Sequence, residues 1–89
     1  MILVVTYDLR KPGKDYSSLI IAINKLQAVW KPLLSAWIVD TSSSPQQILE
    51  YLLPYMDAND GLFVAQLAEN WWSSGLDPSG VKWLQSRSF

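Results

Sequence analysis

The residues of this chain that could do chemistry are few, and the first of them ends an apolar stretch. Asp8 closes the run that begins at Ile2, and Arg10, Lys11 and Lys14 follow it at once. Carboxylate oxygens are ligands that Mg²⁺ prefers, and the bound ion polarises a phosphate and acidifies its water. Asp8 is therefore a candidate catalytic and metal-binding residue. The alternative is a strand-end aspartate that accepts backbone hydrogen bonds from the following loop.

The basic residues after Asp8 stand just before an expected helix, whose free N–H groups favour anions. Arg10, Lys11 and Lys14 could hold a phosphate of a nucleic acid, and Lys31 could extend the patch if its hairpin folds toward them. The alternative is a turn with solvated charges, because three charges without repeated glycines do not make a phosphate loop.

Three further aspartates complete the candidates. Asp40 ends another apolar run and becomes a second metal ligand if its strand lies beside that of Asp8. Asp57 and Asp60 superficially resemble a calcium loop, but the glutamate required at its twelfth position is missing. A turn is the expected structure there.

Histidine and cysteine are both absent, which narrows the possible chemistry. Imidazole general bases, thiolate nucleophiles, disulfides and zinc sites of the cysteine type are excluded. Any reaction must use carboxylates, lysine, hydroxyls or an oxygen-bound cation such as magnesium. Seven basic and eight acidic side chains nearly balance, which argues against strong sequence-independent binding of nucleic acid through net charge.

Length and composition predict one globular domain of cytoplasmic location. A chain of 89 residues with five tryptophans can bury one core but not two. No uncharged run approaches the roughly 18 to 20 residues that cross a bilayer, so no membrane-spanning segment is expected.

The candidate residues must be positioned by a short series of elements. Residues 2–9 are β-branched and aromatic and predict a strand. A helix should begin at Asp15 or Ser17, because Leu19, Ile23, Leu26 and Trp30 recur at helical spacing. Residues 29–41 fit a second strand or a hairpin, with residues 34–39 as its apolar centre.

The second half repeats the helix-then-strand pattern. Ser44-Pro45-Gln46-Gln47 is typical of a helix start with a capping box, and Pro54 should end that helix. A turn at residues 57–61 leads to a strand at residues 62–68. The remainder predicts an irregular arm with a short helix near residues 79–85.

This order predicts an α+β fold of ferredoxin-like βαββαβ type, with an antiparallel sheet and two helices on one face. Residues 1–69 would form that domain, and residues 70–89 the tryptophan-rich arm, packed on its own subunit or on a partner. The other sheet face needs a cover, and a homodimer that stacks sheet on sheet would supply it.

The tryptophans allow two interpretations. Trp71, Trp72 and Trp83, with Trp30 and Trp37, could stack unpaired bases. Aromatic residues beside so few cations more often fill a core or a dimer interface, which is the interpretation we favour.

Several stretches together resemble a known family. They are "YDLRKPGKDY", "WKPLLSAWIVDT" and "SPQQILEYLLPYMDANDGLFVAQL", followed by the tryptophan-rich tail. The chain resembles the SinR-like proteins of bacteria and phages, which are similar to the second CRISPR-associated protein, here called Cas-two.

The resemblance implies a ferredoxin-like homodimer with a nucleic-acid-related role. Tyr7-Asp8 matches a pair in that family whose aspartate lies at the dimer interface and is assigned to magnesium binding for cleavage of RNA or DNA. The basic helical residues with which that family bridges DNA have no clear counterpart beyond Lys25. Three functions stay open: a magnesium-dependent nuclease, a non-catalytic dimeric module that binds protein or nucleic acid, and a toxin-like or antitoxin-like element.

Overall fold

The computed structural model describes all residues, 1–89, and contains one sheet and three α-helices. The elements in chain order are β1 (Ile2–Asp8), α1 (Ser17–Asn24), β2 (Ala28–Leu33), β3 (Ala36–Asp40), α2 (Pro45–Leu52), a 3-10 turn η1 (Leu53–Tyr55), β4 (Gly61–Gln66) and α3 (Pro78–Gln85). None of the helices combines the length and apolar character that crossing a membrane requires.

The four strands form a single antiparallel sheet in the order β2-β3-β1-β4. β1 is central: it pairs with β3 on one side and β4 on the other. The expected α+β class with an antiparallel sheet is confirmed.

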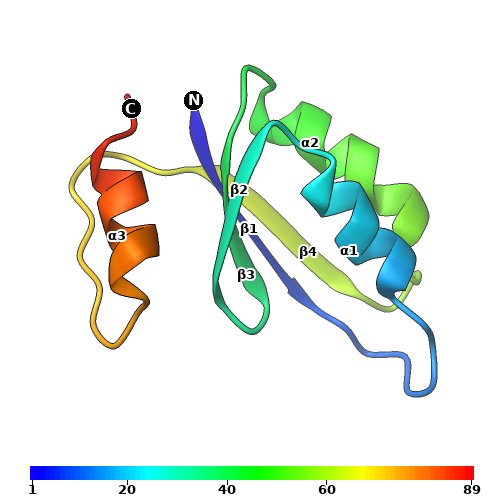
Figure 1. Cartoon of the computed structure of the whole chain (residues 1–89). Helices are drawn as coiled ribbons and strands as arrows, with labels where there is room; N and C mark the ends of the chain where they lie inside the picture. Colours follow the sequence, from blue (N-terminus) through cyan, green and yellow to red (C-terminus); the bar gives the residue numbers. More distant parts are fainter.

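The main core lies between one face of the sheet and the pair α1 and α2, which lie side by side (Figure 1). Alternate residues of β1 and β3 point to this side, and both helices cover them. The ten buried residues are Leu3, Val5, Tyr7, Leu19, Ala22, Ile23, Trp37, Val39, Ile48 and Leu52. The Trp37 indole N–H donates to the Tyr7 hydroxyl at 3.0 Å within this core.

The opposite face of the sheet is covered at one end by α3, which lies on the far side from α1 and α2 (Figure 1). Leu84 of α3 forms a second small core with Ile2 and Ile38. A side chain at Gly80 would overlap the Trp30 indole, so the glycine lets α3 lie directly on that ring. The cover that this face was expected to need is therefore supplied at this end by the chain's own arm.

Two local predictions were also wrong. Trp30 has helical spacing from Leu19, but α1 ends at Asn24 and Trp30 lies in β2. Leu34 was placed in the apolar centre of the hairpin, but it lies in the turn between β2 and β3 and is 92% exposed. In both stretches the apolar residues continue beyond the end of the predicted helix or strand.

The predicted capping of α2 is confirmed. The Ser44 hydroxyl accepts from the Gln47 backbone N–H, and the Gln47 side chain accepts from the Ser44 N–H, at 3.2 and 2.8 Å. The short helix of the arm begins at Pro78, where the Asp77 carboxylate caps it by accepting from the Ser79 N–H.

Candidate functional site

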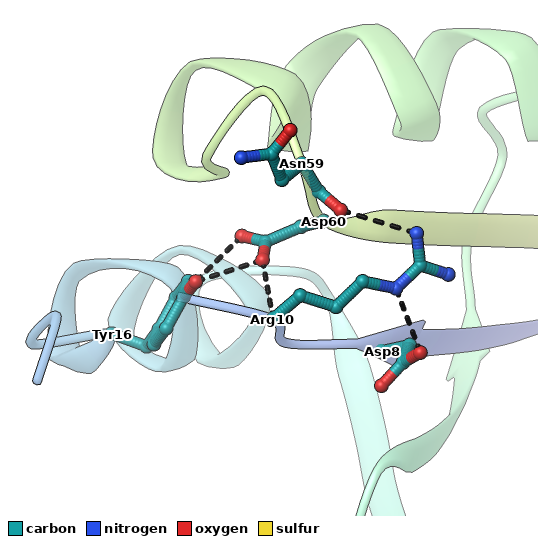
Figure 2. A network of polar contacts seen from close by, with 5 residues as sticks. All are labelled: Asp8, Arg10, Tyr16, Asn59 and Asp60. Carbon is teal, nitrogen blue, oxygen red and sulfur yellow. Dashed lines mark hydrogen bonds and ion pairs between the residues drawn. The ribbon is translucent and has the colours of Figure 1, made fainter. Parts of the chain in front are cut away.

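Asp8 lies at the end of β1, beside Gly61 of β4, on the face of the sheet that is opposite α1 and α2. Its side chain is 70% exposed. The Arg10 Nε donates to Asp8 Oδ2 at 2.8 Å, so an ion pair occupies one oxygen of the carboxylate (Figure 2). A metal ion or a substrate at this carboxylate would therefore compete with the Arg10 guanidinium.

Arg10 is held by further contacts to the loop that precedes β4 (Figure 2). Its backbone N–H donates to Asp60 Oδ1 at 2.7 Å, and its Nη1 donates to the Asn59 carbonyl at 3.1 Å. A Cβ at Gly61 would come within 3.0 Å of Arg10 Nη2, so the glycine leaves the space in which the guanidinium lies. Arg10 therefore joins two loops that are far apart in the sequence.

Asp60 is the acceptor at the centre of this network. The Tyr16 hydroxyl lies 2.8 Å from both of its carboxylate oxygens, and the Asp57 N–H donates at 2.8 Å. Partial burial opposes the charge, but the hydrogen bonds from Arg10, Asp57 and Tyr16 outweigh it and lower the pKa of Asp60. Burial, followed by the hydrogen bond to Asp60, raises the pKa of Tyr16.

Lys11 and Lys14, the other two basic residues of the loop between β1 and α1, also have partners within the chain. Lys11 Nζ lies 3.4 Å from Asp57 Oδ1, and the Lys14 ammonium lies 5.0 Å from the centre of the Tyr16 ring. The Asn59 backbone N–H, and then Lys11, lower the pKa of Asp57. Two of the three cations proposed for phosphate binding are thus matched by carboxylates, which weakens their attraction for an anion.

Lys31 is not brought to this loop. It lies on β2, an edge strand separated from β4 by β3 and β1, and its ammonium is 5.3 Å from the centre of the Trp37 ring. The predicted extension of the basic patch is therefore not formed within one chain.

Asp40 lies beside β1 as the sequence suggested, but at the opposite end from Asp8. The antiparallel register pairs Asp40 with Ile2. β1 is roughly 20 Å long at the rise per residue of a strand, which keeps the two carboxylates apart. Asp40 instead pairs with Arg87, whose Nη1 is 3.1 Å away, and with the Met1 amino group at 3.7 Å.

No group of three or more histidine, cysteine, aspartate or glutamate side chains is close enough to hold a metal ion. Asp8 alone supplies two oxygens, one of which already accepts from a cation. Asp57 and Asp60 belong to the expected turn, in which the Asp60 N–H donates to the Asp57 carbonyl at 3.0 Å.

A shallow pocket of about 360 Å³ lies next to Asp8 on the open part of the sheet. Thr6, Asp8, Gly61 and Phe63 line it from the face opposite α1 and α2. Phe63 is 64% exposed, which is unusual for an aromatic residue of a strand. The sequence did not single out Phe63, because an apolar residue in a strand looks the same in sequence whether its face of the sheet is covered or exposed.

Comparison of the chain with models of known protein families, with curated proteins and with solved structures gave no match.

Proposed function

We propose that the protein is a homodimeric, non-catalytic binding module for nucleic acid, built on a ferredoxin-like subunit. The order of elements and the strand order β2-β3-β1-β4 fit that arrangement. The resemblance to SinR-like and Cas-two-like proteins supports the nucleic-acid class of the partner. In the proposed assembly the arm stays on its own subunit, where α3 already packs.

The proposed dimer forms through a row of side chains that crosses the uncovered end of the sheet. The register places Phe63 opposite Thr6, Thr6 opposite Ala36, and Ala36 opposite Leu33. These four residues share one face, and the two at the ends of the row, Phe63 and Leu33, are exposed. A second copy related by a two-fold axis would bury both ends in one isologous contact.

The dimer is tested by solution mass. Phe63→Asp places a charge in the row and should convert a dimer to a monomer in light scattering at micromolar concentration, because an unpaired buried charge is costly. Ile21→Asp is the matched control, since Ile21 is an exposed apolar residue of α1 on the other side of the molecule. A wild-type protein that is monomeric throughout this range would refute the dimer.

The Asp8–Arg10 ion pair is the observation that favours a non-catalytic module. A guanidinium on the carboxylate competes with a metal ion for the same oxygen, and this chain has no group of three or more acidic, histidine or cysteine side chains that could hold an ion. An exposed pair of this kind contributes little stability, about 0–1 kcal/mol, so Asp8→Asn should fold normally.

Incubation with labelled RNA and DNA tests this part of the proposal. We expect no magnesium-dependent cleavage by the wild type or by Asp8→Asn. Cleavage by the wild type that Asp8→Asn abolishes would contradict it and establish the second candidate, a nuclease at the dimer interface. One observation favours that candidate: Asp8 lies next to Phe63 at the open end of the sheet, where a partner's Asp8 could approach.

A further inference from the structure

A groove of about 500 Å³ separates the arm's irregular stretch from α3 and the residues that follow it. Trp71 and Trp72 line it on one side, Gln85 of α3 on the other, and Arg87 and Phe89 at the chain end. Its volume is in the range of small-ligand sites. The groove lies outside the site around Asp8, with which it shares no residue.

Trp72 is the least covered large side chain of the groove. It is 93% exposed, whereas Trp71 and Trp83 pack against the small core under α3. A bare indole beside a groove offers a flat face on which another ring can stack, and every nucleobase has such a face. The second core therefore accounts for Trp71 and Trp83 but not for Trp72.

The groove also carries hydrogen-bonding groups that the fold does not use. Glu69 lines it and takes part in none of the ion pairs of the chain. A carboxylate only accepts hydrogen bonds, while the exposed Gln85 amide both donates and accepts. A suitable ligand must therefore offer neighbouring N–H donors as well as a planar ring.

We propose that this groove binds one unpaired nucleobase, stacked on Trp72, with guanine preferred. The Watson–Crick edge of guanine presents two adjacent N–H groups, which a carboxylate such as Glu69 can accept together. A proline-rich peptide also packs into aromatic grooves. Its proline residues supply carbonyls without N–H groups, which would leave Glu69 without a donor.

Arg87 gives the groove one cation, but that cation is already engaged. Its Nη1 pairs with Asp40 at 3.1 Å, and its guanidinium lies 5.1 Å from the centre of the Trp83 ring. The site accordingly holds the base rather than the phosphate backbone. Its affinity should depend only weakly on salt, in contrast to a site made of several phosphate contacts.

This inference rests on the proposed function, because it names the ligand of the module, but it does not depend on the dimer. The test measures the fluorescence anisotropy of labelled single-stranded uracil oligonucleotides with and without one central guanine. Wild type should bind the guanine-containing strand more tightly. Trp72→Ala should weaken binding of that strand by roughly 5-fold to 100-fold, the effect of losing one stacking contact.

Two further variants make the result specific. Leu34→Ala is the matched control, because Leu34 is as exposed as Trp72 but lies outside the groove, and its binding should equal that of the wild type. Glu69→Gln should remove the preference for guanine, so that the strands with and without guanine bind with equal affinity. Neither Trp72 nor Glu69 is a core residue, so all three variants should keep the circular dichroism of the wild type.

The remaining outcomes test this inference together with the proposed function. If strands bind the wild type and Trp72→Ala equally, the nucleic-acid module stands and the groove is not its site. If no strand binds, both proposals fail. If a labelled proline-rich peptide binds in a Trp72-dependent manner and the strands do not, the groove is a peptide site and the base assignment is wrong.

Discussion

At the scale of single residues, Asp60 shows how a carboxylate can be committed to structure. It accepts hydrogen bonds from Tyr16, Arg10 and Asp57, which together keep its pKa below the ordinary value. The folded state therefore prefers the ionised form. This contribution to stability is present above the ordinary aspartate pKa and is lost as the pH falls through the lowered pKa of the folded state.

The hydroxyl of Tyr16 should be responsible for part of this effect. Tyr16→Phe removes one donor, so the pKa of Asp60 should move up toward its ordinary value. The gain in stability as the pH rises through the acidic range should become smaller. NMR titration of the carboxyl carbon and urea unfolding at several pH values measure these two changes.

Tyr51→Phe is the control for this prediction, because the Tyr51 hydroxyl donates to the Ala22 carbonyl and not to a carboxylate. It should lower stability by a similar amount at every acidic pH. An Asp60 pKa that is the same in Tyr16→Phe and wild type would show that the backbone donors alone set it.

Residue types alone identified Asp8 and the basic loop, but not what they contact. Two of the partners of Arg10, Asn59 and Asp60, are about fifty positions later in the chain, and no local pattern marks them. The same holds for Tyr16 and Asp60. Spacing predicts which face a residue takes, but the pairing of two loops depends on where separate elements place them.

At the scale of elements, the docking of α3 depends on a missing side chain. Glycine in a helix ordinarily costs roughly 1 kcal/mol relative to alanine. Gly80 is tolerated because the Trp30 indole occupies the space where its Cβ would be. With α3 in this close contact, its Leu84 lies in the core with Ile2 and Ile38.

Gly80→Ala tests this contact because helix propensity and packing predict opposite signs. Propensity alone would stabilise the protein, whereas the overlap with Trp30 should destabilise it by about 1–3 kcal/mol. Urea unfolding measures the difference, and Lys82→Ala, on the exposed side of α3, should have little effect. Higher stability of Gly80→Ala would mean that α3 does not rest on Trp30.

Element types were predictable, whereas their ends were less so. The capping box at Ser44 and Gln47 fixes the start of α2 from sequence, because both partners are local. The end of α1 had no such signal: Leu26 and Trp30 continue its apolar spacing although the chain has already turned into β2. Leu26 lies after the end of α1 but still packs against the main core, so its apolar character reflects burial and not helical structure.

At the scale of the whole molecule, the two faces of the sheet are covered unequally. One face has α1 and α2 along it, while the other has α3 at the Ile2 end and the exposed row with Phe63 at the Asp8 end. The sequence predicts that a second layer is needed on that face. It does not predict that the arm covers only one end of this face. The arm packs there through a contact between Gly80 and Trp30, which are far apart in the sequence.

The central position of β1 also determines when this protein can acquire its structure during synthesis. β1 precedes both of its partners in the chain, because it pairs only with β3 and β4, which place Asp40 beside Ile2 and Gln66 beside Leu3. β1 therefore has no partner until β3 is complete at Asp40, and no second partner until β4 is complete at Gln66. Pairing β1 with strands this far along the chain closes long loops, which slows folding. Until those strands pair with it, the apolar residues of β1 stay exposed.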